Sequence, residues 1–306
     1  MYTPMIADDG IGSTLAEAIS VAIGERFELI ATEAVSGGCI HTALKITGEM
    51  RGGKKSYFAK VNDAERKALF AAEADGLAAI EKAGSVRVPK VIARGDDDER
   101  AWLVLEWLDL VPLDARGGAA LGEALAAQHR VRQEKFGWGR DNFIGSTPQV
   151  NGWTEDWLSF WREKRLVAQL RLAAHNRLPS RLIDRGERLV ADCDAFFRNY
   201  RPAKSLLHGD FWGGNASAVA SGPPAVVDPA VYVGDREADL AMTELFGGFP
   251  KEFKAAYRAA WPLDDGYSTR RDLYNLYHVL NHANLFAGSY VRQAEQSIEK
   301  LLAEIR

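Results

Sequence analysis

Apolar residues follow two different periods along the chain. Over the first third they alternate with polar residues in short runs, which is typical of strands. The strands are expected at 34–46 (a hairpin), 56–61, 86–92 and 102–108, with one long helix at 64–82. Further helices are expected, from apolar residues at helical spacing, at 119–132, 154–175, 182–200, 252–261 and 270–286. The pattern predicts a strand-rich amino-terminal lobe, residues 1–108, and a mainly helical lobe, residues 109–306.

The composition is that of an ordinary globular protein. Of the 306 residues, 47% are apolar and 26% are charged, which suffices for a sizeable core. The 38 basic and 42 acidic residues give a net charge of -4, so no nucleic-acid partner is expected. The first ten residues lack the features of a signal peptide, and no apolar run approaches a membrane span. Two cysteines give no disulfide framework, so we expect a cytoplasmic protein.

The strongest chemical signal is the run HGDFWGGN at 208–215, followed by Asp228 directly after an apolar triplet. An Asp, an Asn five residues later and an Asp thirteen residues after that match the spacing of kinases. Asp210 is then the base that accepts the proton of the attacking hydroxyl, while Asn215 and Asp228 supply oxygen ligands for Mg²⁺. His208 is expected to orient the loop. Each residue alone could cap a turn, but the ordered set predicts phosphoryl transfer.

ATP would bind to the strand-rich half. Ser36, Gly37 and Gly38 form the turn of the expected hairpin, where exposed amide groups can approach phosphates, although ordinary hairpins use the same residues. The crossing between the lobes is expected at Glu106 to Asp109, where main-chain groups would bond the adenine edge. A core strand without ligand contact is the alternative there.

Lys60 is a lysine inside a strand-like run, and such a lysine needs an anionic partner. We expect Lys60 to contact the α- and β-phosphates and Glu73, in the middle of the long helix, to hold it. Glu65 competes with Glu73, and Lys54 and Lys55 compete with Lys60 from a charged, Gly-rich turn. A solvated surface pair is the alternative reading of both residues.

Longer motifs support a family identification. They lie at 135–138 (KFGW), 141–149 (DNFIGSTPQ), 157–170, 208–215 and 228–250, and the last begins with Asp-Pro-Ala and continues with Gly-Asp-Arg-Glu-Ala-Asp-Leu-Ala. Through these motifs the chain resembles the fructosamine kinase (ketosamine 3-kinase) family. That family is related to aminoglycoside phosphotransferases and choline kinases, and the resemblance implies a bilobal protein-kinase-like fold.

The resemblance also implies a reaction. Family members use ATP and Mg²⁺ to phosphorylate the 3-hydroxyl of a ketosamine, which is the rearranged adduct of a sugar on an amine. The 3-phosphate leaves readily, so the product breaks down and frees the amine, which is deglycation. The acceptors implied are ribulosamine, erythrulosamine or fructosamine adducts, as small molecules or on glycated proteins. A kinase for an aminoglycoside or choline, or a pseudokinase that only binds nucleotide, remains an alternative.

Several residues near the expected site are candidates for acceptor contacts. Trp212 and Tyr232 could stack on the substrate, or they could belong to the core. Asp235 and Arg236 could shape the pocket, or they could form a charge cluster at the start of a helix. Asp239 matches an Asp that in kinase-like folds bonds the backbone of the catalytic loop, so it is expected to be structural.

Cys39 lies in the expected phosphate loop. Loop amides and a nearby lysine would lower the pKa of its thiol, and an exposed thiolate can be oxidised or can pair with a second copy. We therefore predict a redox switch, in a monomer or a redox-dependent homodimer. The alternative is a small residue that packs the loop. Cys193, within a helical run, is expected to be a buried and inert thiol.

Overall fold

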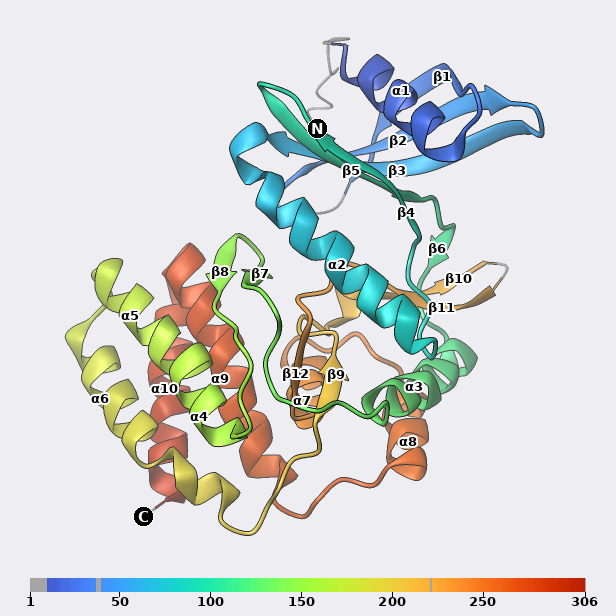
Figure 1. Cartoon of the computed structure of the whole chain (residues 1–306). Coiled ribbons are helices and arrows are strands. Elements are labelled where there is room, and N and C mark those ends of the chain that lie inside the picture. The colour runs from blue at the N-terminus through green and yellow to red at the C-terminus, as the bar shows by residue number, and fades with distance from the viewer. Residues whose placement is uncertain (1–9, 37–39, 221, 306) are drawn as a thin grey trace.

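The structure is a computed structural model that describes residues 10–36, 40–220 and 222–305. It has two lobes, a strand-rich one at the top of Figure 1 and a larger one below it. The upper lobe holds a five-stranded antiparallel sheet in the order β1-β2-β3-β5-β4. Its strands are β1 (Glu28–Ala34), β2 (Thr42–Met50), β3 (Gly53–Asp63), β4 (Val91–Asp96) and β5 (Arg100–Glu106).

Helices cover both faces of this sheet. They are α1 (Ile11–Ile23) and α2 (Lys67–Ala83), the latter preceded by the 3-10 turn η1 (Ala64–Arg66). Successive side chains of a strand point to opposite faces, and β5 shows the result. Trp102 and Val104 enter the core beneath α1, while Leu103 and Leu105 enter the core beneath α2. The interior of β5 is therefore apolar throughout.

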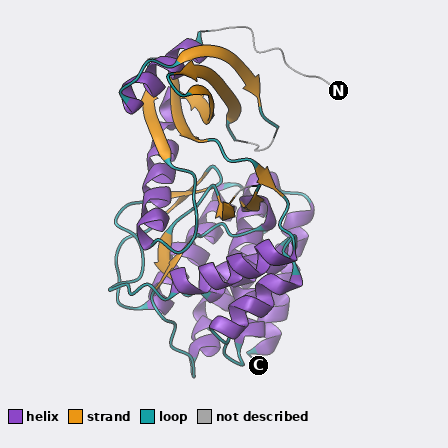
Figure 2. Cartoon of the chain, turned by 90° about the vertical axis from the view of Figure 1, so that its right-hand side faces the viewer, coloured by secondary structure: helices purple, strands orange, loops and turns teal. Residues whose placement is uncertain are grey.

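The lower lobe is mainly helical (Figure 2). Its helices are α3 (Ala115–His129), α4 (Trp157–Trp161), α5 (Ala168–His175), α6 (Ser180–Ala191), α7 (Glu237–Leu245), α8 (Lys251–Ala260), α9 (Tyr267–Phe286) and α10 (Ser289–Glu304), with the π-helical turn η2 (Arg162–Val167) between α4 and α5 and the 3-10 turn η3 (Cys193–Phe197) after α6. Within the described ranges, no helix is long and apolar enough to cross a membrane.

Short strands of the lower lobe carry the loops that face the sheet. They are β6 (Leu110–Val111), β9 (Ser205–Leu207), β10 (Ala216–Val219), β11 (Gly222–Val226) and β12 (Tyr232–Gly234), with the 3-10 turn η4 (Gly213–Asn215) before β10. Strands β11, β10 and β6 form one sheet, and β12 pairs with β9. The loop from β9 to β10 therefore carries Asp210, and the loop from β11 to β12 carries Asp228. A separate hairpin is formed by β7 (Asn142–Ile144) and β8 (Thr147–Gln149).

One apolar core runs through both lobes. It joins Phe70 of α2 to Val226 of β11 and to Val231 in the loop after β11. Gly76 of α2 faces the same loop, because a Cβ at this position would lie 3.1 Å from Val231 Cγ2. The long helix of the upper lobe thus rests directly on the segment that follows Asp228.

The two-part α+β organisation predicted from the pattern is confirmed, and one strand is corrected. The strand expected at 86–92 begins only at Val91. Val86 and Val88 leave the sheet and enter the core between the lobes, where Arg87 pairs with β11. Helices α1, α7 and α10 were not among the predicted elements. The lobe boundary expected after residue 108 falls between β5 and β6, and it stays a prediction.

Candidate active site

A buried ion-pair network joins the two lobes. Lys60 on β3 donates from Nζ to Glu73 Oε1 on α2 at 2.7 Å, and to Asp228 Oδ1 at 2.6 Å. The Lys60 side chain is 7% exposed, whereas that of Asp228 is 45% exposed. Burial alone would lower the pKa of Lys60, but Glu73 and Asp228 outweigh it and hold this pKa above its ordinary value. Lys60 is therefore a fixed cation between two carboxylates.

The backbone of Asp228 is bent sharply. Its φ of 56° lies in the left-handed region, which Asp tolerates better than most residues other than glycine. Such a conformation persists only where neighbouring contacts impose it. Here the Val227 N–H donates to the Asn215 carbonyl at 3.0 Å, and the Ala230 N–H donates to the His208 carbonyl at 2.8 Å. Both bonds tie the loop of Asp228 to the loop of Asp210.

Asn215 and Asp210 are directly bonded. Asn215 Nδ2 donates to the main-chain oxygen of Asp210 at 2.9 Å and to its Oδ2 at 3.0 Å. An amide has two N–H donors, and both of them are used here. The amide oxygen Oδ1 of Asn215 is thereby left as the acceptor that can bind a cation.

The environment of Asp210 suits a base. Burial, followed by repulsion from Asp228, raises the pKa of Asp210 to about 7, while the hydrogen bond from Asn215 opposes this rise. A general base works best when its pKa lies near the operating pH. The structure thus gives Asp210 a proton affinity suited to accepting a hydroxyl proton near neutral pH.

His208 links the same two loops. Its Nε2 lies 2.9 Å from the Val227 carbonyl, and its Nδ1 lies 3.3 Å from the Asp210 N–H. Both bonds form only if Nε2 carries the proton and Nδ1 accepts, so the ring is neutral. Burial lowers the pKa of His208, in agreement with this tautomer. His208 therefore orients the loop, as the sequence predicts.

Asp239 on α7 fixes the start of the catalytic loop from below. Its carboxylate accepts the N–H groups of His208 at 2.7 Å and Gly209 at 2.9 Å, as well as His129 Nε2 at 3.1 Å. Burial would raise the pKa of Asp239, but the bonds from these residues prevail and lower it. The expected structural role of Asp239 is confirmed. No local pattern marks His129 as the partner of Asp239, because the two residues lie far apart in the chain.

The family model described as fructosamine kinase matches residues 12–304. The chain belongs to the fructosamine kinase family. A relative from Synechocystis sp., named a probable ketoamine kinase, is 40% identical over 294 residues, which cover 94% of this chain and 96% of the relative. A relative from Arabidopsis thaliana, named a chloroplastic protein-ribulosamine 3-kinase, is 36% identical over 287 residues, with 92% and 86% covered.

Solved structures agree with this family. A protein from Haemophilus somnus 129PT, whose crystal structure bears the name "putative fructosamine-3-kinase", superimposes with a TM-score of 0.83 at 28% identity, and the match covers 94% of this chain and 96% of that protein. The ADP-bound aminoglycoside phosphotransferase APH(2'')-Ib superimposes with a TM-score of 0.63 at 14% identity, with 96% and 99% covered. At that identity the likeness shows the fold alone. The fold is the bilobal protein-kinase-like one.

The donor set fits the Mg²⁺ that this family fold implies. Mg²⁺ prefers hard oxygen ligands and is usually bound through one or two protein groups together with substrate phosphates. Asp228 offers a half-exposed carboxylate, and Asn215 offers its amide oxygen. The Lys60 ammonium already lies 2.6 Å from Asp228, which shows that a cation is accommodated at this carboxylate.

The remaining nucleotide-binding candidates are less well defined. Ser36 is exposed just beyond the end of β1, while Gly37, Gly38 and Cys39 lie outside the described residues. Glu106 is engaged within the protein, because its side chain accepts from Arg87 Nη2 at 3.2 Å and its N–H donates to the Lys90 carbonyl at 2.8 Å. Its expected contact with adenine is thus confined to the main-chain carbonyl.

Three of the four acceptor candidates are buried. Tyr232 lies in the core with its ring 4.1 Å from the Arg165 guanidinium carbon. Asp235 accepts from Tyr274 Oη at 2.6 Å, and Arg236 donates to the Pro262 carbonyl at 2.6 Å. Because these side chains are buried and already bonded, the structure favours the alternatives of core packing and a charge cluster over acceptor contacts, which stay predictions. Trp212 is 39% exposed and remains a candidate.

An aromatic row that the sequence did not reveal extends from Trp212. Ring centroids lie 6.2 Å apart for Trp212 and Phe246, and 5.2 Å apart for Phe246 and His282. The row continues to Phe286 and Tyr290. Its members come from the catalytic loop, from the residue after α7, and from α9 and α10, so no local sequence signal marks them.

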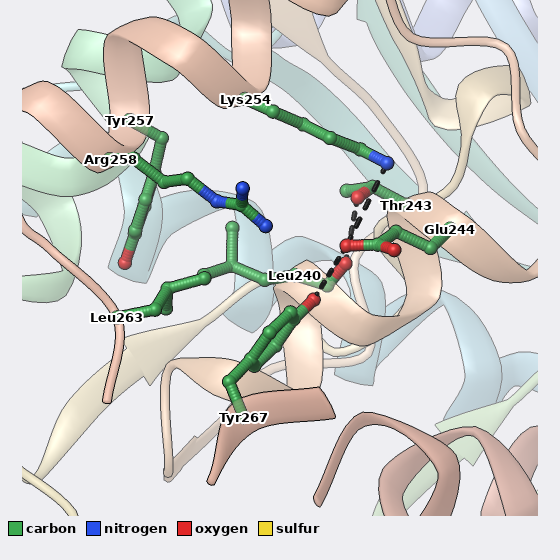
Figure 3. Close-up of a pocket in the computed structure, with 8 residues that line it drawn as sticks. All are labelled: Leu240, Thr243, Glu244, Lys254, Tyr257, Arg258, Leu263 and Tyr267. Carbon is green, nitrogen blue, oxygen red and sulfur yellow. Dashed lines mark hydrogen bonds and ion pairs between the residues drawn. The ribbon is translucent and has the colours of Figure 1, made fainter. Parts of the chain in front are cut away.

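The small cavity in Figure 3 lies elsewhere, among residues of α7 and α8 and near the start of α9. Its volume is about 10 Å³, which corresponds to one water molecule. Glu244 accepts from Tyr267 Oη there at 2.9 Å, and Lys254 Nζ is 3.7 Å from the same carboxylate. None of the candidate site residues lines this cavity, so it is not the acceptor site.

Proposed function

We propose that the protein transfers the γ-phosphoryl group of ATP to the 3-hydroxyl of ketosamines and thereby starts their removal from amines. The observation that carries this proposal is the bonded pair of Asp210 and Asn215 beside Asp228, with Lys60 reaching Asp228 from the other lobe. The names of the relatives, ketoamine kinase and protein-ribulosamine 3-kinase, support the acceptor class.

ATP binds between the lobes in this proposal. Lys60 contacts the α- and β-phosphates, and Glu73 keeps its ammonium in place through the 2.7 Å bond. Ser36 and its neighbours lie over the phosphates, and the main chain near Glu106 faces the adenine. Asp228 and Asn215 would hold Mg²⁺, which when bound would supply positive charge against the phosphoryl oxygens.

Asp210 moves the proton. The 3-hydroxyl of the acceptor transfers its proton to the Asp210 carboxylate. The hydroxyl oxygen attacks the γ-phosphorus, and the bond between that phosphorus and the leaving oxygen of ADP breaks. The proton remains on Asp210 until the product departs. Asn215 Nδ2 holds Oδ2 of Asp210 at 3.0 Å, so one carboxylate oxygen is fixed and the other can face the acceptor.

Acceptor details go beyond the family assignment. We infer that ribulosamine, erythrulosamine or fructosamine adducts are used, either as small molecules or on proteins, and that Trp212 lines their site. The exposed ring of Trp212 is two residues from Asp210, and an aromatic face suits an apolar sugar surface. A cytoplasmic location, a monomeric or redox-dependent dimeric state and a regulatory Cys39 stay predictions from the sequence.

The decisive experiment uses ATP, Mg²⁺ and a ribulosamine-modified lysine peptide. The wild type is expected to transfer phosphate and release free amine, and Asp210→Asn is expected to lower kcat about 100- to 10,000-fold, because it removes the proton acceptor. Phosphorus NMR follows the transfer. Asp114→Asn is the matched control, since Asp114 only caps α3 by accepting the Gly117 N–H at 2.6 Å.

Two outcomes would contradict the proposal. One is a wild type that phosphorylates choline or an aminoglycoside but no ketosamine. The other is an Asp210→Asn variant with wild-type turnover. Loss of turnover in Asp114→Asn as well would indicate general damage to the lower lobe.

A further inference from the structure

The segment after Asp228 is held from the hairpin side by two buried side-chain amides. Asn142 on β7 donates from Nδ2 to the Val231 carbonyl at 2.7 Å, and Gln149 on β8 donates from Nε2 to the Ala230 carbonyl at 3.2 Å. Asn142 is 4% exposed and Gln149 is 1% exposed. Two successive main-chain carbonyls next to the proposed magnesium ligand are thus bonded by one hairpin.

The orientation of these amides is fixed by their neighbours. Asn142 Oδ1 accepts from Gln149 Nε2 at 2.8 Å and from Asn151 Nδ2 at 2.8 Å. Gln149 Oε1 accepts from Tyr277 Oη at 2.8 Å. With its oxygen occupied by two donors, Asn142 can present only its N–H group to Val231.

A buried arginine anchors the base of the hairpin. Arg165, in the π-helical turn η2, donates from Nη2 to Asn151 Oδ1 at 2.8 Å and from Nη1 to the Val150 carbonyl at 2.7 Å. It is fully buried, and no carboxylate pairs with it in the described part of the chain. Burying a cation costs free energy, and here the oxygen atoms of the segment after β8 that Arg165 bonds are uncharged. These two bonds hold the base of the hairpin against η2.

The hairpin tip reaches the upper lobe. A Cβ built at Gly145 in the turn would lie 3.6 Å from Ile40 Cδ1, just before β2, and 3.9 Å from Leu285 Cδ1 on α9. Arg140, just before β7, also pairs with Asp75 of α2 at 2.6 Å. Figure 1 shows the hairpin rising beside α2. The hairpin is thus supported at its base, at its tip and against α2.

The other side of the same segment faces the catalytic loop. The Ala230 N–H bonds the His208 carbonyl at 2.8 Å, and a Cβ on Gly209 would collide with the Ala230 carbonyl oxygen. The segment is therefore clamped between the loop of Asp210 and the hairpin. Asp228 precedes this clamp by two residues and has the left-handed φ of 56°, which needs such support.

We propose that Asn142 and Gln149 are positioning residues that hold Asp228 in the conformation that binds Mg²⁺ with ATP. They touch neither substrate nor metal, and they act through the carbonyls of Ala230 and Val231. The inference rests on the proposed function for the use of MgATP, and it assigns a role to the DNFIGSTPQ motif at 141–149. Through these two residues the motif holds the loop that carries Asp228.

The test measures nucleotide binding by isothermal titration calorimetry. Asn142→Asp keeps the shape of the side chain but removes the N–H that bonds Val231, and Gln149→Leu removes the donor to Ala230. Mg²⁺ is expected to raise the affinity of wild type for ATP. In both variants this increase should be smaller by a factor of about ten or more, as is usual when a partner that orients a metal ligand is removed. Their affinity for ATP in EDTA should fall by a much smaller factor, because without Mg²⁺ Asp228 does not bind the nucleotide through the metal and acts only through its bond to Lys60.

Trp157→Phe is the control for loss of stability. It removes another buried bond of the lower lobe, from Trp157 Nε1 to Tyr274 Oη at 3.0 Å, without touching the clamp. It should leave the Mg²⁺-dependent gain unchanged. A folded Asn142→Asp variant with the wild-type gain, or equal losses with and without Mg²⁺, would overturn the proposal.

Two further points keep the test decisive. Circular dichroism checks folding, and if Asn142→Asp does not fold, Gln149→Leu decides, since it removes the longer bond of 3.2 Å to the segment together with the 2.8 Å bond to Asn142 Oδ1, and leaves the bond from Asn142 to Val231 in place. No acceptor is used in this assay. A wild type that binds MgATP yet phosphorylates no ketosamine would contradict the proposed function. The role of Asn142 and Gln149 would still be decided by the binding assay alone.

Discussion

At the scale of single residues, the site depends on where one ammonium lies. Lys60 is shared between Glu73 of its own lobe and Asp228 of the other, at 2.7 and 2.6 Å. Removing one partner of a buried ion pair lowers the stability of a protein, because the remaining charge is left uncompensated. In this site Asp228 remains as a second partner, so loss of Glu73 should misplace Lys60 more than it unfolds the protein.

The Glu73→Gln variant should therefore bind and use ATP poorly. We expect kcat/KM for ATP to fall about 10- to 100-fold, because the amide holds the ammonium less firmly against Asp228. Steady-state kinetics with varied ATP measures this ratio. Glu65→Gln, an exposed position in η1, is the matched control and should behave as wild type. Equal effects of the two changes would contradict the assignment of Glu73.

At the scale of elements, a close contact between α3 and α8 positions the residues that support the catalytic loop. Gly122 on α3 faces α8 so closely that a Cβ would meet the main-chain oxygen of Phe253 and would lie 3.0 Å from the Tyr257 nitrogen. This approach lets His129 Nδ1, at the end of α3, bond Tyr257 Oη at 2.8 Å while its Nε2 bonds Asp239. Two helices thus position the residue that supports the loop.

Gly122→Ala should push these helices apart. Alanine favours helix, but the collision is with backbone and cannot be relieved by a side-chain rotation, so we expect a net loss of about 1–3 kcal/mol of stability. Urea unfolding measures the loss. Gly52→Ala, in the β2–β3 turn where a Cβ would meet nothing within 4 Å, should leave the unfolding midpoint nearly unchanged. An unfolding midpoint for Gly122→Ala at or above that of wild type would refute the contact.

At the scale of the whole molecule, neutral histidines that are buried or half-buried link stability to pH. Burial lowers the pKa of His278 to about 3 and that of His41 to about 4, and it also lowers the pKa of His208. In the unfolded chain each of these residues would bind a proton near the ordinary histidine pKa of 6.5. The stability that they contribute is therefore complete above that value and is lost as the pH falls below it.

His278→Leu isolates one of these contributions. Between pH 6.5 and the lowered value of about 3, wild type should lose up to about 1.4 kcal/mol per pH unit relative to this variant, because only the wild-type unfolded chain gains that proton. Urea unfolding at pH 7.5, 6 and 4.5 gives the difference. His175→Leu is the control, since His175 is exposed at the end of α5. A difference between wild type and His278→Leu that does not change with pH would falsify the prediction.

Much of the site could be predicted, because its chemistry is carried by residue types at fixed spacing. The pairing of Lys60 with Glu73 follows from a lysine in a strand and a glutamate in the next helix. Burial at Tyr232 and Asp235 could not be read in the same way, since β12 is buried along its whole length and Asp235 follows it into the interior, where packing by distant elements covers both residues. His129 is 110 residues from its partner Asp239, a contact that only the packing of α3 and α7 creates.

The exposed ring of Trp212 makes the catalytic loop visible to fluorescence. Of the eight tryptophans in the sequence, Trp102, Trp157 and Trp161 are buried, and Trp107, Trp138 and Trp261 are partly buried, while Trp212 is 39% and Trp153 is 52% exposed. In a Trp153→Phe background, Trp212 would be the most exposed tryptophan, and the difference in acrylamide quenching between this protein and a Trp153→Phe, Trp212→Phe double variant would report on Trp212. An acceptor that covers this ring should reduce quenching, so binding can be followed without a label and without turnover.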